Sequence, residues 1–258
     1  MTAAGELRTS GALWSSYGRG EPTTLVVHGL GATSGEARIP ASGVDGTRVV
    51  VTLPGHGDAV DATASYWNYE RIAEDVLAIA DEVGATRAVG VSLGAGALTR
   101  LLAQHPDRFE RCALLLPAAS DRSRDARSTS VLGGLAEAVR DAPGDDGARL
   151  RALVAEGLPE GVAVGDYVEQ RAEALSRLGD ALSVMPGQRP IADLAELGPA
   201  VSRVLVVGAV DDPLHPSEVA EELAGAIADA RLELLPSPAP MLTHRSELRR
   251  LLTGFLDG

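Results

Sequence analysis

Two short stretches of the sequence contain residue types that could carry out acyl transfer. The first is GVSLG, residues 90–94, in which Ser92 stands between two glycines at GxSxG spacing. The second is LPSPAPMLTHRSEL, residues 235–248, which contains His244. A serine hydroxyl is a weak nucleophile until a neighbouring base takes its proton. The question is whether the fold brings such a base to Ser92.

GxSxG spacing indicates a nucleophile when a strand ends directly before the serine and a helix begins directly after it. Here the run 86–94 is typical of a strand, and the pattern from Ser92 to Gln104 predicts a helix. The flanking glycines permit a tight turn, and the start of the helix aims N–H groups at any oxyanion formed there. The alternative is a glycine-rich turn whose serine only caps the helix. We favour the nucleophile because the strand-turn-helix context fits.

The elements that must position these residues are continuous apolar runs that alternate with helical patterns. Continuous rather than alternating apolar character indicates strands covered on both faces, as in a parallel sheet. The order of strand and helix predicts a doubly wound α/β fold, preceded by an antiparallel hairpin. The expected strands are 24–29, 47–55, 86–94, 111–117, 202–210 and 230–236, and the expected helices are 69–83, 92–104, 218–229 and 246–256.

The region 121–190 breaks this rhythm, because it has helical patterning and no convincing strand. It begins with the polar link SDRSRDARSTS and contains the turn-rich spacer DAPGDDG. We therefore expect a core domain made of residues 1–120 and 191–258, with residues 121–190 as a helical insertion over the carboxyl edge of the sheet. Its leucines and valines at helical spacing suit the lining of an apolar pocket, or simply pack the insertion onto the core.

The chain resembles the α/β-hydrolase family along almost its whole length. The resemblance is carried by VVHGLGA (26–32), LPGHGDA (53–59), GVSLG (90–94), DDPLHP (211–216) and the order of strands between them. It implies a mostly parallel sheet with a helical cap insertion. It also implies an oxyanion hole made by the backbone N–H groups of Leu30, which follows the His-Gly pair, and Leu93, which follows the serine.

The same resemblance puts a catalytic acid on the loop after the strand that follows the insertion. Asp211 and Asp212 both fit this position, and Asp121, after the preceding strand, is a more distant alternative. We choose Asp212, because the Asp-Pro turn fixes its backbone where the loop crosses the sheet edge. The alternative for this pair is an Asx-type turn that only shapes the loop.

The family's histidine normally follows the last strand, and the matching slot here falls at or near Pro240, which cannot accept a proton. His244 lies four residues later, and about 13 Å of extra chain would let a bulged loop carry it to Ser92. We therefore take His244 as the base. Two alternatives remain. One is His215, which lies on the same loop only three residues from Asp212, a separation that we expect to be too short for that acid to orient it easily. The other is that no histidine acts as the base. His28 and His56 are expected to be structural.

The leading hypothesis is a serine hydrolase that cleaves an ester, thioester or lactone of a small or medium, partly apolar substrate through an acyl-enzyme. The alternative, favoured by Pro240, is a protein of the same fold without a working triad that binds a ligand or catalyses a lyase or cyclisation step. No metal or cofactor is expected in either case.

Composition narrows the expected partners. The net charge is −13, and a strongly acidic chain argues against nucleic acid. The sequence has no signal-peptide pattern and no apolar run of about 18 residues, so we expect a cytoplasmic protein with a small-molecule substrate and no membrane contact. The sequence does not indicate an oligomeric state.

Overall fold

The computed structural model describes residues 3–159, 161–162 and 165–258. Eight strands form one sheet in the order β1-β2-β4-β3-β5-β6-β7-β8. The first two strands pair antiparallel and the other six run parallel, which confirms the predicted doubly wound, mostly parallel sheet. The strands are β1 (Ala4–Glu6), β2 (Leu13–Gly18), β3 (Thr23–Val27), β4 (Thr47–Thr52), β5 (Arg87–Val91), β6 (Arg111–Leu115), β7 (Arg203–Ala209) and β8 (Arg231–Leu235).

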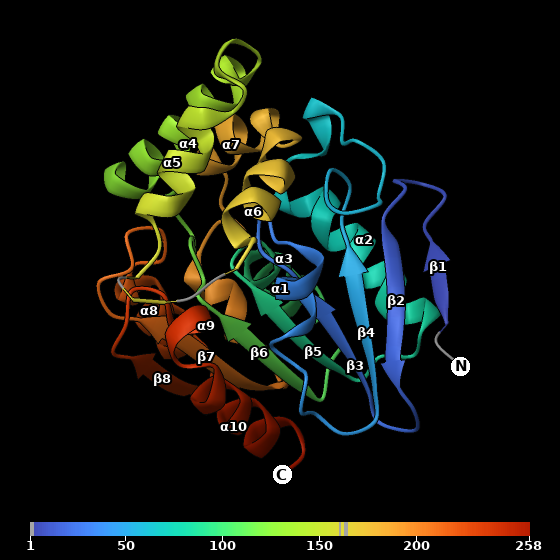
Figure 1. Ribbon diagram of the computed structural model, residues 1–258. Helices are drawn as coiled ribbons and strands as arrows, with labels where there is room; N and C mark the ends of the chain where they lie inside the picture. The colour runs from blue at the N-terminus through green and yellow to red at the C-terminus, as the bar shows by residue number, and fades with distance from the viewer. Residues whose placement is uncertain (1–2, 160, 163–164) are drawn as a thin grey trace.

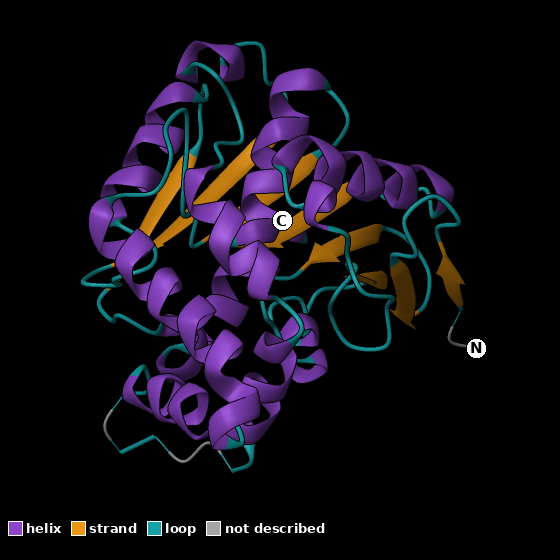
Figure 2. Cartoon of the chain, turned by 90° about the horizontal axis from the view of Figure 1, so that it is seen from above, coloured by secondary structure: helices purple, strands orange, loops and turns teal. Residues whose placement is uncertain are grey.

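Helices cover both faces of this sheet (Figure 2). They are α1 (Ser34–Arg38), α2 (Tyr69–Glu82), α3 (Leu93–Gln104), α4 (Ala126–Asp145), α5 (Ala148–Glu156), α6 (Tyr167–Ser176), α7 (Gly179–Val184), α8 (Ser217–Ala226), α9 (Pro240–Thr243) and α10 (Arg245–Leu256). Short 3-10 turns are η1 (Ala64–Tyr66), η2 (Met185–Gly187) and η3 (Leu194–Leu197).

Each face of the sheet has its own apolar core, because successive side chains of a strand point to opposite faces. One core joins Leu25, Val27 and their neighbours to α2, α3 and α8, and the other joins Val26, Val50 and their neighbours to α10. This double burial is why the strands read as continuous apolar runs. Cys112 of β6 is buried in the first core.

The segment 121–190 contains helices α4 to α7, and its described residues include no strand. Figure 1 shows these helices together above the carboxyl ends of the parallel strands. The division of the chain into a core domain and a separate insertion stays a prediction. In the described part of the chain, no helix is both long and apolar enough to cross a membrane.

Candidate active site

Ser92 lies on a sharp turn between β5 and α3, at the carboxyl edge of the sheet. Its backbone has φ 51° and ψ −102°, and residues other than glycine rarely adopt such a positive φ. Its amide donates to the carbonyl of Leu115 on the neighbouring strand (2.9 Å), which anchors the strained turn. The hydroxyl accordingly projects from the end of the strand instead of capping the helix, since it makes no cap hydrogen bond.

The two glycines of GxSxG are required by close backbone contacts. A Cβ on Gly90 would lie 2.4 Å from the carbonyl oxygen of Gly94, and a Cβ on Gly94 would lie 2.3 Å from the carbonyl oxygen of Val27. Such distances are far below van der Waals contact, so α3 can approach β3 and β5 only if both residues lack a side chain. The spacing therefore has the steric origin that the sequence suggested.

His215 is the histidine that meets Ser92. Its Nε2 lies 2.9 Å from Ser92 Oγ, and its Nδ1 lies 2.7 Å from Asp212 Oδ2. The side chains of His215 and Asp212 are 13% and 8% exposed. A hydroxyl, an imidazole and a carboxylate are thus joined in series by two hydrogen bonds, which is the geometry of a serine-histidine-acid triad.

Asp212 orients a histidine only three residues away because its carboxylate also folds the loop. Oδ1 accepts the amide N–H of Leu214 (2.8 Å), which closes an Asx turn and leaves Oδ2 facing the imidazole at the next position. A separation of three residues therefore does not prevent the acid from orienting the ring, contrary to the expectation from the sequence. The sequence signal was DDPLHP itself, an Asp-Pro turn with a histidine two residues after the proline.

The protonation states of the pair follow from its surroundings. Burial alone would raise the pKa of Asp212, but the hydrogen bonds and charge of His215 and the backbone amide of Leu214 lower it overall. An ionised carboxylate only accepts hydrogen bonds, so Nδ1 of His215 carries the proton that it donates to Asp212. Nε2 then presents its lone pair to the hydroxyl of Ser92.

The other two candidate acids do not reach this histidine. Asp211 precedes Asp212 with φ +63°, and it is exposed. Asp121 accepts from the hydroxyl of Ser120 (3.3 Å) and lies 3.8 Å from Arg122. Of the three, the structure brings only Asp212 to the imidazole that contacts Ser92.

The structure corrects the expectation for His244. The four residues that precede it form the short helix α9 instead of a bulged loop, because Pro240 is well suited to the first turn of a helix. The Nδ1 atom of His244 lies 2.8 Å from the hydroxyl of Thr243, and its carbonyl begins α10 by accepting from Leu248. Its ring does not contact Ser92 and is absent from the wall of the cavity described below.

The first turn of α4 and the link before it hold the loop that carries Asp212 and His215. The hydroxyl of the fully buried Ser128 donates to the carbonyl of Pro213 (2.9 Å), and Nη1 of Arg124 donates to the carbonyl of Leu214 (2.8 Å). Both carbonyls between the acid and the imidazole therefore have a partner from segment 121–190. These contacts restrain the loop in the conformation in which the imidazole faces Ser92.

Two buried histidines hold the loop after β3, where Leu30 lies. Nε2 of His28 accepts from the amide of Leu53 (3.1 Å), and Nε2 of His56 accepts from the amide of Gly31 (2.8 Å). Burial lowers the pKa of His28 to about 4 and that of His56 well below its usual range, so both rings are neutral at pH 7. Their role in the structure is to support the loop.

Leu93 follows Ser92 directly in the chain, and Leu30 lines the same cavity as Ser92. Neither amide N–H has an acceptor among the described residues, whereas the neighbouring amides of Gly31 and Gly94 are used by His56 and the carbonyl of His28. An oxyanion hole requires free donors of this kind, and the assignment of that role to Leu30 and Leu93 stays a prediction.

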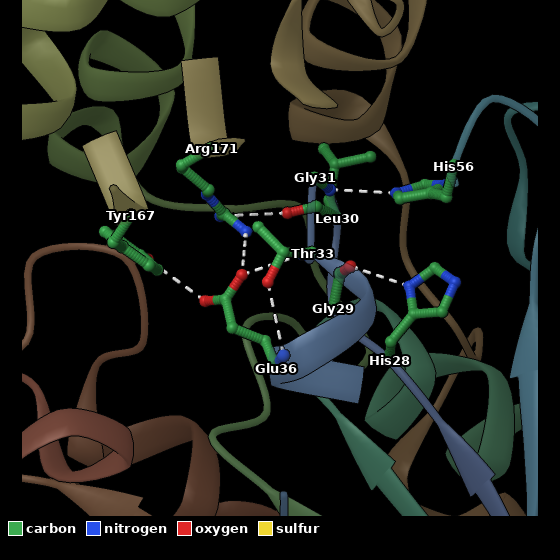
Figure 3. Close-up of polar contacts among 9 residues, drawn as sticks. All are labelled: His28, Gly29, Leu30, Gly31, Thr33, Glu36, His56, Tyr167 and Arg171. Atoms are coloured by element: carbon green, nitrogen blue, oxygen red, sulfur yellow. Dashed lines mark hydrogen bonds and ion pairs between the residues drawn. The ribbon is translucent and has the colours of Figure 1, made fainter. Parts of the chain in front are cut away.

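Helix α6 reaches the same loop from the other side (Figure 3). Nη2 of Arg171 donates to the carbonyl of Leu30 (3.0 Å), so Arg171 and His56 hold the two ends of the Leu30–Gly31 peptide. Arg171 also lies 3.4 Å from Glu36 of α1, whose other oxygen accepts from the hydroxyl of Tyr167 (3.0 Å). Segment 121–190 therefore contacts both the loop of Leu30 and the loop of His215.

A cavity of about 160 Å³ opens over Ser92 and His215. Its apolar wall comes from the sheet edge, the loops and segment 121–190, and its charged lining residues are Arg124, Arg171 and Glu36. The apolar lining residues include Leu116, Leu132, Leu135, Leu175, Leu182 and Met241. Among the described residues, no group of three or more His, Cys, Asp or Glu side chains is arranged to hold a metal ion.

The chain belongs to the alpha/beta hydrolase family. The family model described as "Alpha/beta hydrolase family" matches residues 24–249, which include the serine turn and both loops of the site. This membership confirms the resemblance drawn from the motifs.

Solved structures of other proteins share the fold at low sequence identity. An alpha/beta hydrolase enzyme from a Medee basin deep-sea metagenome library is 13% identical with a TM-score of 0.80, covering 99% of this chain and 98% of its own. An esterase from Exiguobacterium antarcticum is 17% identical with a TM-score of 0.74, covering 96% of each chain. An enol-lactonase from Burkholderia xenovorans LB400 is 20% identical with a TM-score of 0.69, covering 99% of this chain and 100% of its own. These likenesses concern the fold.

Proposed function

We propose that this protein is a serine hydrolase that cleaves a carboxylic ester, thioester or lactone through an acyl-enzyme on Ser92. The observation that carries the proposal is the pair of hydrogen bonds that joins Ser92 Oγ to His215 and His215 to Asp212. A nucleophile, a base and an orienting acid in this order are the minimum set for acyl transfer.

In the acylation step, Oγ of Ser92 attacks the carbonyl carbon of the substrate while Nε2 of His215 takes the hydroxyl proton. The carbonyl oxygen gains the negative charge of the tetrahedral intermediate, and the amides of Leu30 and Leu93 donate to it. The bond to the leaving alcohol or thiol then breaks, and the imidazolium returns the proton to that leaving group. Asp212 stabilises the imidazolium and keeps its ring in the required tautomer.

Deacylation repeats these transfers with water. His215 takes a proton from a water molecule that attacks the acyl carbon, and the same proton returns to Ser92 when the acid product leaves. The free enzyme is regenerated with Nδ1 protonated. No cofactor is needed for either half of the cycle.

In this proposal the insertion 121–190 acts as a helical cap that sets the size and polarity of the substrate. Leucines of α4, α6 and α7 line the cavity, and the volume of about 160 Å³ favours a small acyl group. The neighbours described as an esterase and an enol-lactonase act on bonds of this chemical class, which is in keeping with the proposal.

The alternative of a chain without a working triad rested on Pro240 in the expected histidine slot. The argument from Pro240 weakens because a different histidine contacts Ser92, so the base does not have to come from the loop after β8. A ligand-binding protein of this fold would have no need of the strained Ser92 turn.

The test is the reaction with p-nitrophenyl butyrate. We expect release of p-nitrophenol, a butyryl adduct on the peptide that contains Ser92 after acid quenching, and loss of both in Ser92→Ala. Ser130→Ala, which changes an exposed serine of α4, is the matched control and should retain activity. Undiminished turnover in Ser92→Ala would exclude the acyl-enzyme route.

A further inference from the structure

Arg124 is a cationic side chain in the wall of the cavity, and it forms no ion pair with a carboxylate among the described residues. Its Nη1 donates to the carbonyl of Leu214, but its Nε is buried without an acceptor in the described residues. Within that part of the chain, no carboxylate oxygen lies within 4.0 Å of its guanidinium nitrogens. One nitrogen therefore fixes the guanidinium, and neither Nε nor Nη2 has a hydrogen-bond partner in the part of the chain that the structure describes.

The second arginine of the cavity shows what a paired guanidinium looks like at the same site. Arg171 contacts both Glu36 and the carbonyl of Leu30, so its charge is balanced and its donors are used. Glu36 also accepts from Tyr167 and from the amide of Thr33. Of the three charged lining residues, Arg171 and Glu36 compensate each other and Arg124 remains as a net positive charge.

The side chain of Arg124 is only partly exposed, in the wall of the cavity. Burial lowers the pKa of Arg124, and the carboxylates around it, Asp212 and Asp125, only partly offset that effect. A buried cation without a carboxylate partner is costly, and such groups are normally paired in folded proteins. A guanidinium in a protein stays protonated, so the cavity keeps this positive charge at neutral pH.

Nη2 is the nitrogen of Arg124 that a carboxylate in the cavity can reach. It has no hydrogen-bond partner among the described residues and, unlike Nε, it is not fully buried. Its N–H groups can donate to a carboxylate oxygen in a charge-assisted hydrogen bond, while Nη1 is already bonded to Leu214. Leu214 adjoins His215, so a carboxylate held by Arg124 would lie close to the reacting groups.

We propose that Arg124 binds a carboxylate of the substrate, and that the enzyme acts on small esters, thioesters or lactones that carry a free acid group. This inference rests on the proposed hydrolase function and names its substrate class. The leucines of the cavity contact the short apolar chain between the ester and the acid, and the small volume limits that chain to a few carbons. The protein has a net charge of −13, so Arg124 supplies a local attraction for an anionic substrate that the protein as a whole does not.

The test compares two esters of similar length that differ in charge. The neutral ester is p-nitrophenyl butyrate, and the acidic one is the mono-p-nitrophenyl ester of glutaric acid. We expect the wild type to prefer the acidic ester in kcat/KM by about tenfold or more, since a hydrogen bond to a charged group can change an affinity by up to about a hundredfold. In Arg124→Gln this ratio should fall to about one.

The ratio separates recognition from positioning. Arg124 also holds the carbonyl of Leu214, so its replacement lowers the absolute rates of both esters, and only the loss of a carboxylate contact changes their ratio. Arg122→Gln is the matched control, because Arg122 is an exposed arginine two positions away that pairs with Glu222. Arg122→Gln should leave kcat/KM for both esters, and therefore their ratio, unchanged.

A second pair of esters carries the charge on the other side of the scissile bond, as 4-acetoxybenzoate against phenyl acetate. A preference for the acid in either pair, lost in Arg124→Gln, supports the proposal and tells which half of the substrate Arg124 contacts. Equal kcat/KM for acidic and neutral esters in both pairs overturns it. Binding of glutarate to the Ser92→Ala variant, measured by calorimetry, should weaken about tenfold in Ser92→Ala/Arg124→Gln, and equal affinities would also overturn it. This readout is independent of hydrolysis, so a failed hydrolase function and a failed carboxylate site give different results.

Discussion

Two loops at the same edge of the sheet each carry a histidine, and the structure uses them differently. The loop after β7 holds His215 against Ser92, whereas the loop after β8 folds into α9 and carries His244 to the start of α10. The first loop is tied internally by Asp212 and externally by Ser128 and Arg124. In the second, the hydrogen bonds of His244 within the described residues go to its neighbour Thr243 and to backbone. The comparison teaches that hydrogen bonds along a loop, and not its place in the strand order, decide which imidazole reaches the serine.

The largest effect should come from replacing the two histidines one at a time. His215→Gln removes the base and should lower kcat for p-nitrophenyl butyrate by about four orders of magnitude or more. His244→Gln should change kcat by less than twofold. Steady-state kinetics of the two variants measure the difference, and a severe loss in His244→Gln with an active His215→Gln would reverse the comparison.

The next effect concerns the adjacent aspartates of the first loop. Asp212→Asn keeps the size of the side chain but no longer stabilises the imidazolium or fixes its tautomer, so kcat should fall about a thousandfold or more. Asp211→Asn alters an exposed side chain and should leave kcat almost unchanged. The account is wrong if both variants lose activity to the same extent.

A smaller effect should come from the contacts that hold each loop. Ser128→Ala leaves the carbonyl of Pro213 without its partner and lets the loop of His215 move, so kcat should fall roughly tenfold with KM unchanged. Thr243→Val removes the hydroxyl beside His244 and should not affect turnover. Circular dichroism of both variants checks that the fold is retained, and equal kcat values would remove the positioning role of Ser128.

The buried histidines sharpen the comparison through stability instead of catalysis. The pKa of His28 is about 4 in the folded protein and about 6.5 when unfolded, so the unfolded chain binds more protons between these values and stability falls as the pH falls. Between pH 7 and pH 5 we expect a loss of about 2 kcal/mol in the free energy of unfolding from His28, with His56 adding in the same direction. Urea unfolding at the two pH values measures this, and His28→Asn should reduce the slope. A free energy that is equal at pH 7 and pH 5 contradicts it.

The sequence was sufficient for the fold because both faces of the parallel sheet are buried, and this burial leaves continuous apolar runs between helical patterns. The serine turn could also be predicted, since the steric demand at Gly90 and Gly94 is local. The identity of the base could not be predicted, because the distance from a loop histidine to Ser92 depends on an Asx turn and on contacts from Ser128 and Arg124. These two residues are 85 and 90 positions from the carbonyls they bind. The unpaired edge of Arg124 is likewise a property of the assembled cavity.

The central claim, that His215 activates Ser92, is tested most directly by the rate at which a fluorophosphonate labels the serine. This reaction needs the nucleophile and its base but no knowledge of the natural substrate. The account predicts that the wild type and His244→Gln are labelled on Ser92 at similar second-order rates, while His215→Gln, folded by circular dichroism, is labelled at least a hundredfold more slowly. Rapid labelling of His215→Gln, or loss of labelling in His244→Gln, would contradict it.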